Sequence, residues 1–130
     1  MPVPIHLNTR SRTEMMDITS LVQKEVTKAE IQDGLCVVYV PHTTAGVTIN
    51  EGADPDVCED IETRMNELAP RHGGYRHAEG NADSHIKASL TGNSVSLLVE
   101  NGKLVLGTWQ KIFFFEFDGP RSRKVYVKVV

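Results

Sequence analysis

The pattern of apolar residues predicts strands near the start of the chain and, most densely, in its last third. Residues 5–9 (IHLNT) and 35–40 (LCVVYV) have strand character, and Pro41 ends the second run. Further strands are expected in "SVSLLVE", "KLVLGTWQKIFFFEF" and "KVYVKVV". Asn101-Gly102 separates two of these runs, and Asn-Gly between apolar runs is a strong hairpin signal. A second turn is expected at residues 118–120.

The final strand shows the clearest alternation. Val125, Val127 and Val129 alternate with Lys124, Tyr126 and Lys128. Side chains point to opposite faces of a strand in turn, so this pattern predicts one buried face and one face in water.

Apolar residues recur with helical spacing over residues 17–34. Asp17 is available as the N-cap and Gly34 as a residue just beyond the C-terminal end. The apolar side chains that share one face of this helix are Ile18, Leu21, Val22 and Val26.

The segment 54–70 gives the strongest helix signal in the chain. Asp54 is a suitable cap, Pro55 fits the first helical position, and Pro70 ends the helix. Its apolar stripe consists of Val57, Ile61, Met65 and Leu68. A shorter helix is predicted to begin at Asp83 or Ser84 and to close at Gly92, after a polar loop.

These elements predict an α+β fold whose core is dominated by strands. We expect a β-sandwich of mostly antiparallel strands with two or three flanking helices. A chain of 130 residues is long enough for one core, so residues 1–130 are predicted to form a single domain.

Composition narrows the possible partners. The formal charge is −3 and the sequence pI is about 5.9, which argues against a nucleic-acid partner because such proteins usually carry a basic face. No apolar run is long enough to span a membrane. Cys36 and Cys58 do not form a metal-binding CxxC pair, and unpaired thiols fit a reducing compartment such as the cytoplasm.

The stretch "HAEGNADSHIKASL" concentrates groups that bind ligands and transfer protons. His77 and His85 are separated by a loop that contains Gly80, so both imidazoles can face one point. Two histidines and a third ligand from another strand are a common arrangement for a zinc site. The alternatives are solvated or structural histidines, with Asp83 acting only as a helix cap.

Three other positions have candidate chemistry. The segment 42–51 (HTTAGVTINE) follows a buried strand, and "LGTWQK" places Thr108, Trp109 and Gln110 within an apolar run, where unpaired polar groups cost free energy. Arg121 and Arg123 alternate after a turn, so both could clamp a phosphate or carboxylate, although two solvated arginines are equally compatible with the pattern.

Three blocks of the sequence resemble a known family. "VPHTTAGVTINEGADPDV", "HAEGNADSHIKASLTGNSV" and "NGKLVLGTWQKIFFFEFDGPRSRKV" are similar to the signature blocks of the YjbQ-like family, often labelled secondary thiamine-phosphate synthase. The similarity runs almost from end to end. It departs from the usual pattern at Thr44, Ala45, Gly46 and Phe114, where no titratable group is lost.

The resemblance implies a β-sandwich that assembles as a homotrimer, with a polar pocket near the subunit boundary that holds a metal or an anion. The residues expected to bind substrate or anion are Thr43, Asn50, Asn81, Asp83, Thr108, Gln110, Arg121 and Arg123. Those expected to act in catalysis are His42, Glu51, His77, Glu79 and His85.

The implied activity joins a pyrimidine diphosphate to a thiazole phosphate with loss of pyrophosphate. His42, His77 and His85 would then converge on a divalent metal, zinc or magnesium, or directly on the anion. Glu51 or Glu79 would transfer a proton. The alternative functions are a metal-dependent hydrolase and a non-catalytic trimeric binder of a small anionic or phosphorylated metabolite.

Overall fold

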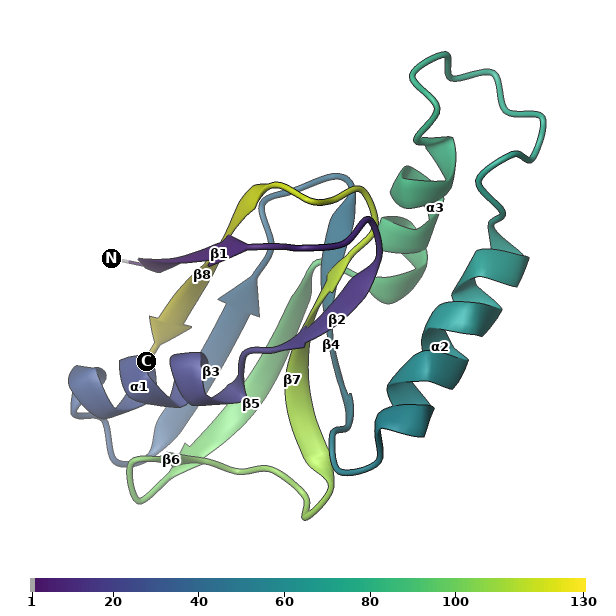
Figure 1. Ribbon diagram of the computed structural model, residues 1–130. Helices are drawn as coiled ribbons and strands as arrows, with labels where there is room; N and C mark the ends of the chain where they lie inside the picture. The colour runs from purple at the N-terminus through teal and green to yellow at the C-terminus, as the bar shows by residue number, and fades with distance from the viewer. Residues whose placement is uncertain (1) are drawn as a thin grey trace.

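The computed structural model describes residues 2–130, which form two β-sheets and the helices beside them (Figure 1). The bounds of the elements in chain order are β1 Val3–Asn8, β2 Glu14–Asp17, α1 Thr19–Ala29, β3 Gly34–Tyr39, β4 Ala45–Glu51, α2 Pro55–Leu68, α3 Ala82–Thr91, β5 Ser94–Glu100, β6 Lys103–Leu104, β7 Gln110–Glu116 and β8 Ser122–Val129.

The two sheets are antiparallel and curl into a half-barrel. The five-stranded sheet has the order β1-β8-β3-β5-β6, and the three-stranded sheet has the order β2-β7-β4. Helix α1 lies across one end, whereas α2 and α3 lie together beside the smaller sheet (Figure 1). The predicted β-dominated α+β fold is confirmed.

The main core fills the space between the two sheets and α1. Val22 and Val26 of α1 are fully buried against strand residues such as Val38, Phe114 and Val125. The predicted alternation of β8 is confirmed, since Val125 and Val127 are buried and Lys128 is exposed.

Strand β7 is buried on both of its faces. Ile112 and Phe114 pack in the main core, whereas Phe115 and Phe117 pack in a second cluster with Ala88 of α3. Side chains alternate between the two faces of a strand, so a strand covered on both sides needs an unbroken apolar run. This double burial explains the sequence "IFFFEF".

Helix α1 is shorter than its sequence pattern suggests. Its N-cap residue is Ile18 and not the predicted Asp17, although the Asp17 carboxylate still accepts from Thr19 N at 3.0 Å. The helix ends at Ala29, however, and Glu30 has the left-handed φ of 56° expected of Gly34. Gly34 instead begins β3, where a Cβ atom would lie 2.0 Å from the Val130 carbonyl oxygen.

Helix α2 matches its predicted ends, whereas α3 begins at Ala82, before the predicted start at Asp83 or Ser84, and matches only at its C-terminal end. Asp54 caps α2 by accepting from Asp56 N at 2.9 Å, and Gly92 closes α3. The predicted apolar stripe of α2 is only partly correct. Ile61 and Met65 pack beside Phe115 and Phe117, but the Leu68 residue is 72% exposed.

Strands β2 and β4 were not predicted from the sequence. Residues 103–117, predicted as one strand, form the two strands β6 and β7. The chain leaves the larger sheet after Leu104 and enters the smaller sheet at Gln110. "GTWQ" therefore does not interrupt a buried strand: it belongs largely to the exposed connection between the sheets, and Trp109 is 62% exposed.

No helix in the part of the chain that the structure describes has both the length and the apolar character needed to cross a membrane.

Candidate functional site

A polar cavity lies where β4 begins, next to the N-terminal half of α3 and the turn between β7 and β8. It has a volume of about 390 Å³. The residues that line it are Pro41, His42, Thr43, Thr44, Glu79, Asn81, His85, Asp118, Arg121 and Arg123. Seven of these are predicted site residues, so the fold brings together three segments that are distant in sequence.

A second cavity of about 510 Å³ adjoins the first, because both are lined by His42, Thr43 and His85. It extends from the first residue of β4 along the C-terminal half of α3. Its remaining lining residues are Ala45, Ala88, Ser89, Gly92 and Asn93. We call the two cavities together the strand-end pocket.

His42 is fixed by the main chain of β8. Its Nε2 atom lies 3.1 Å from both the amide nitrogen and the carbonyl oxygen of Lys124. The pairing of β3 with β8 ends at Tyr39 and Tyr126. Beyond that point the imidazole of His42, and not a strand, contacts the main chain of β8. Burial lowers the pKa of His42, and the positive charge of Arg123 lowers it further. His42 is therefore uncharged at neutral pH.

His85, His77 and Glu79 form a cluster at the rim. The rings of His77 and His85 meet edge to face, with centroids 5.4 Å apart and an interplanar angle of 81°. Glu79 Oε2 lies 3.7 Å from Nε2 of His77. The three predicted histidines are thus linked, since His42 and His85 line the pocket and His77 contacts His85.

The predicted metal site is not preformed in the single chain. Across residues 2–130, no three side chains of His, Cys, Asp or Glu are grouped so that they could hold a metal ion. The geometry brings only two imidazoles into contact, and the partner of His77 is a carboxylate on an exposed side chain. His42, His77 and His85 therefore do not fit the predicted role as three ligands of one metal.

Asn81, Asp118 and Arg121 form a hydrogen-bonded chain on the opposite wall. Asn81 Nδ2 and Arg121 Nη2 both donate to Asp118 Oδ2, at 2.9 and 3.0 Å. Arg121 Nε also donates to the Asp118 carbonyl oxygen at 2.9 Å. The Oδ1 atom of Asn81 is buried and has no hydrogen-bond partner among the described residues.

The predicted clamp of two arginines is wrong. Arg121 has a half-exposed side chain, but Arg123 lies in the interior, where its Nε donates to Glu116 Oε1 at 2.8 Å and its Nη2 donates to Thr44 Oγ1 at 2.8 Å. Burial raises the pKa of Glu116, but the hydrogen bonds from Arg123, Asp118 N and Thr9 outweigh it and hold that pKa below its usual value. Arg123 is therefore paired in the interior, and its side chain is only 3% exposed, against 50% for Arg121.

Asp83 is also structural, in contrast to its predicted role in binding. It is fully buried beneath the pocket, where Arg12 donates to both carboxylate oxygens at 3.1 Å and Lys87 Nζ donates at 3.0 Å. Burial raises its pKa, but these two cations lower it by more. The network ties α3 to the loop between β1 and β2, and so it positions His85.

Four predicted site residues lie at the wrong end of the smaller sheet. Ala45 pairs with Glu116 at the pocket end of β4, whereas Glu51 pairs with Gln110 at the other end. A strand of 7 residues spans about 20 Å. These residues make local turns instead, as when Gln110 Oε1 accepts from Gly107 N. The residues excluded from the pocket are Asn50, Glu51, Thr108 and Gln110.

The residues that support the site were not predicted from the sequence. Glu116 and Lys87 could have been found, because each is a charge inside an otherwise apolar run, "FFFEF" and "HIKASL". Such charges need partners when they are buried. Arg12 and Asp118 gave no signal, since both lie in polar segments.

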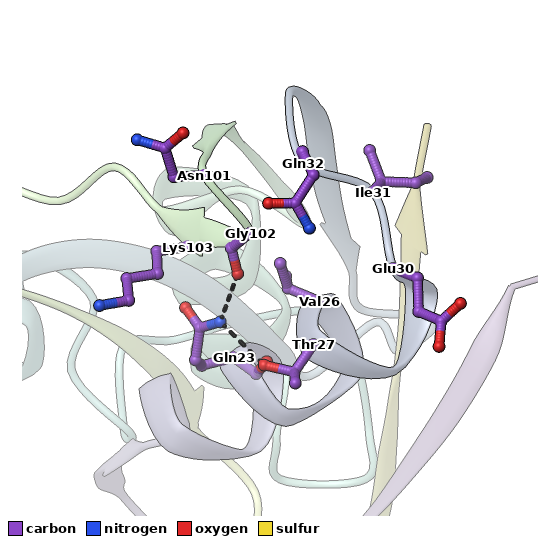
Figure 2. Close-up of a pocket in the computed structure, with 9 residues that line it drawn as sticks. All are labelled: Gln23, Val26, Thr27, Glu30, Ile31, Gln32, Asn101, Gly102 and Lys103. Atoms are coloured by element: carbon purple, nitrogen blue, oxygen red, sulfur yellow. Dashed lines mark hydrogen bonds between the residues drawn. The ribbon is translucent and has the colours of Figure 1, made fainter.

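Another cavity lies at the opposite end of the molecule and contains none of the predicted site residues. Figure 2 shows it between α1 and the turn that joins β5 to β6, with a volume of about 470 Å³. Gln23 Nε2 bridges its floor by donating to the Gly102 carbonyl oxygen at 3.1 Å and to Thr27 Oγ1 at 3.2 Å. Its lining includes neither histidine nor arginine, so the strand-end pocket remains the candidate site.

Comparisons with known proteins agree on one family. Residues 3–130 match the model described as UPF0047 protein YjbQ-like. The chain is 49% identical to the UPF0047 protein YugU of Bacillus subtilis, over 97% of this chain and 96% of the relative. It is 52% identical to a UPF0047 protein of Archaeoglobus fulgidus, over 95% and 97% of the two chains.

Solved structures give the same result. A YjbQ/UPF0047 protein of Clostridium acetobutylicum is 53% identical and superimposes with a TM-score of 0.97, covering 98% of this chain and 99% of that one. A YjbQ-like protein of Sulfolobus solfataricus is 36% identical, with a TM-score of 0.95 and coverage of 99% and 95%.

These findings correct the predicted activity. The relatives are named only as UPF0047 proteins, and the Sulfolobus structure is described as that of a protein of unknown function. None of these names carries a thiamine-phosphate synthase activity, so the prediction that the chain has this activity is wrong. Sequence and structure together show that the chain belongs to the UPF0047 YjbQ-like family.

Proposed function

We propose that the protein binds a small molecule with an anionic group in the strand-end pocket. The observation that carries this proposal is that Arg121, His42 and His85 line one cavity. Guanidinium and imidazole groups are suited to bind phosphate or carboxylate oxygens. Arg121 is the cation available for this role.

The pairing of Arg121 supports its role. Its Nε and Nη2 atoms are oriented by Asp118, while Nη1 donates no hydrogen bond to any residue from 2 to 130. A guanidinium that is held at one edge keeps its remaining donors free, and it loses little conformational entropy when a ligand binds. Arg121 is thus oriented in advance for an oxyanion.

We also propose that the pocket belongs to an enzyme and that His85 transfers a proton. Imidazole is the side chain best suited to proton transfer near neutral pH. His77 contacts the ring of His85, and Glu79 lies close to His77, so a charge that forms on the imidazole pair has a carboxylate nearby. His42 has a different role, because it stays uncharged.

Binding can be tested with inorganic phosphate as the probe. Addition of phosphate to the protein should shift the imidazole NMR signals of His42 and His85 in a saturable way. Arg121→Gln should weaken the binding at least about tenfold, equivalent to about 1.4 kcal/mol. Arg64→Gln is the matched control, since Arg64 is an exposed arginine paired with Glu67 on α2. No saturable shift in the wild-type protein would contradict the proposal.

Proton transfer can be tested with a phosphorylated ketone, dihydroxyacetone phosphate, in D₂O. The wild-type protein should exchange the hydrogens next to the carbonyl group faster than His85→Gln does, as followed by proton NMR. Phosphate binding by both proteins is the control. Equal exchange rates in the two proteins would contradict an acid–base role of His85 toward this class of molecule.

We further propose that the chain forms homotrimers in the cytoplasm, as the resemblance implies. Leu35 and Leu98 are cross-strand partners on the outer face of the larger sheet, and Tyr39 lies on the same face. The three residues are 38%, 64% and 45% exposed. An exposed apolar group of this kind favours a subunit interface, and light scattering that gives a monomer mass would contradict the trimer.

A further inference from the structure

We propose that the ligand of the strand-end pocket has two parts, an anionic head and an uncharged body, joined beside His42 and His85. This inference rests on the proposed binding function and adds the class of ligand. It comes from the unequal chemistry of the two adjoining cavities.

The head half is the cavity with the charged groups. Arg121 supplies the free donors. The head group therefore carries a negative charge whose oxygens accept these hydrogen bonds.

Apart from the two shared histidines, the body half is lined by no titratable side chain. Ala45, Ala88 and Gly92 give it small apolar walls, and Ser89 and Asn93 add neutral polar groups. A charge placed there would lose hydration without gaining a counter-ion. An uncharged body with one or two hydrogen-bonding groups is the better match.

The sizes of the two halves also differ. The body half has a volume of about 510 Å³, against about 390 Å³ for the head half. It therefore has room for a body at least as large as the head group.

The two histidines shared by both halves lie at the junction. His42 and His85 each line both cavities. A ligand that fills both halves would place the bond between its head and its body beside these imidazoles. Proton transfer by His85 would then act at this junction.

The test compares inorganic phosphate, which has only the head, with phenyl phosphate, which has both parts. Isothermal titration should show that the wild-type protein binds phenyl phosphate at least about tenfold more tightly. Ser89→Phe fills the body half from an exposed position of α3. It should remove this advantage and leave phosphate affinity within about twofold. Ser20→Phe, at an exposed position of α1, is the matched control.

Each outcome decides between the proposals. The two-part ligand would be overturned if the wild-type protein bound both probes with equal affinity. It would also be overturned if Ser89→Phe lowered the affinity for both probes equally. Either result would leave anion binding intact. Failure of the wild-type protein to bind either probe would overturn the proposed function itself. Asn93→Leu narrows the same half from another element, and it replaces Ser89→Phe if circular dichroism shows that the first variant is unfolded.

Discussion

Arg123 and Glu116 form an ion pair in the interior between the two sheets, with side chains that are only 3% and 0% exposed. Thr44 accepts a further hydrogen bond from Arg123, and Thr9 donates one to Glu116. The pair joins β7 to β8 directly behind the strand-end pocket. Its position explains why Arg121, two residues earlier, is left as the arginine that a ligand can reach.

Removing one member of this ion pair should lower the free energy of unfolding far more than replacing both members with apolar residues. Arg123→Met leaves Glu116 buried without its cation, and such a loss costs about 3–5 kcal/mol. The double variant Arg123→Met with Glu116→Leu should recover most of that free energy, because no unpaired charge remains. Urea unfolding of the two single variants and the double variant measures this, and additive losses would contradict the coupling.

Acid should destabilise the protein through Asp83 and Glu116. Both carboxyl groups have a pKa lowered in the folded state, so the stability they contribute is present above their unfolded values of 3.8 and 4.5. It is lost as the pH falls through the lower folded values. Asp83→Asn should flatten the decline in unfolding free energy below pH 4.5, whereas Glu67→Gln at an exposed pair should not. Parallel pH profiles for wild type and Asp83→Asn would refute this.

Glu62 should have the opposite effect on the pH dependence of stability. Burial raises its pKa, the hydrogen bond with the Met15 main chain lowers it, and the charges of Glu14 and Glu59 raise it further. Its contribution is therefore present below pH 4.5 and is lost as the pH rises through the folded value. Glu62→Gln should stabilise the protein at pH 7 and have little effect at pH 3. Thermal unfolding at both pH values tests this, and a lower midpoint at pH 7 would count against it.

Gly46→Ala should weaken both the fold and the site. The new methyl group would meet the Gly92 carbonyl oxygen at 2.6 Å and Thr91 Cγ2 at 3.0 Å, and so it would force the end of α3 away from β4. Overpacking of this kind costs about 1–3 kcal/mol. Phosphate affinity should also fall, since α3 carries His85. Gly107→Ala, which faces only the flexible Gln110 side chain, is the control; an unchanged unfolding midpoint in Gly46→Ala would show that the contact relaxes freely.

The sequence predicted those elements whose signals are local. Asp54 capped its helix as expected, and the turn at Asn101-Gly102 forms with positive φ at both residues. Strand β4 was missed because "AGVTINE" has small and polar residues in place of a regular alternation, and because one of its faces is covered by α3.

The site was predicted only in part, because its residues are brought together by pairing between segments that are distant in the sequence. His42 and Glu51 follow the same kind of polar pattern, but they lie near opposite ends of one strand, and only the pairing of β4 with β7 shows this. The burial of Asp83 depends on Arg12, which lies 71 residues away in the sequence, as well as on the nearby Lys87. The burial of Arg123 depends on Glu116 of the other sheet and on Thr44, which lies 79 residues away. A short window of sequence does not contain both members of the long-range pairs.

The position of β8 has a consequence for synthesis of the protein. This strand, residues 122–129, lies between β1 and β3, which form no ladder with each other (Figure 1). The emerging polypeptide therefore cannot assemble its larger sheet until these last strand residues have left the ribosome. Until then β1 has no strand to pair with, and the core residues Val125 and Val127 are missing from the interior. Incompletely folded chains of this kind expose apolar surface and are prone to aggregate.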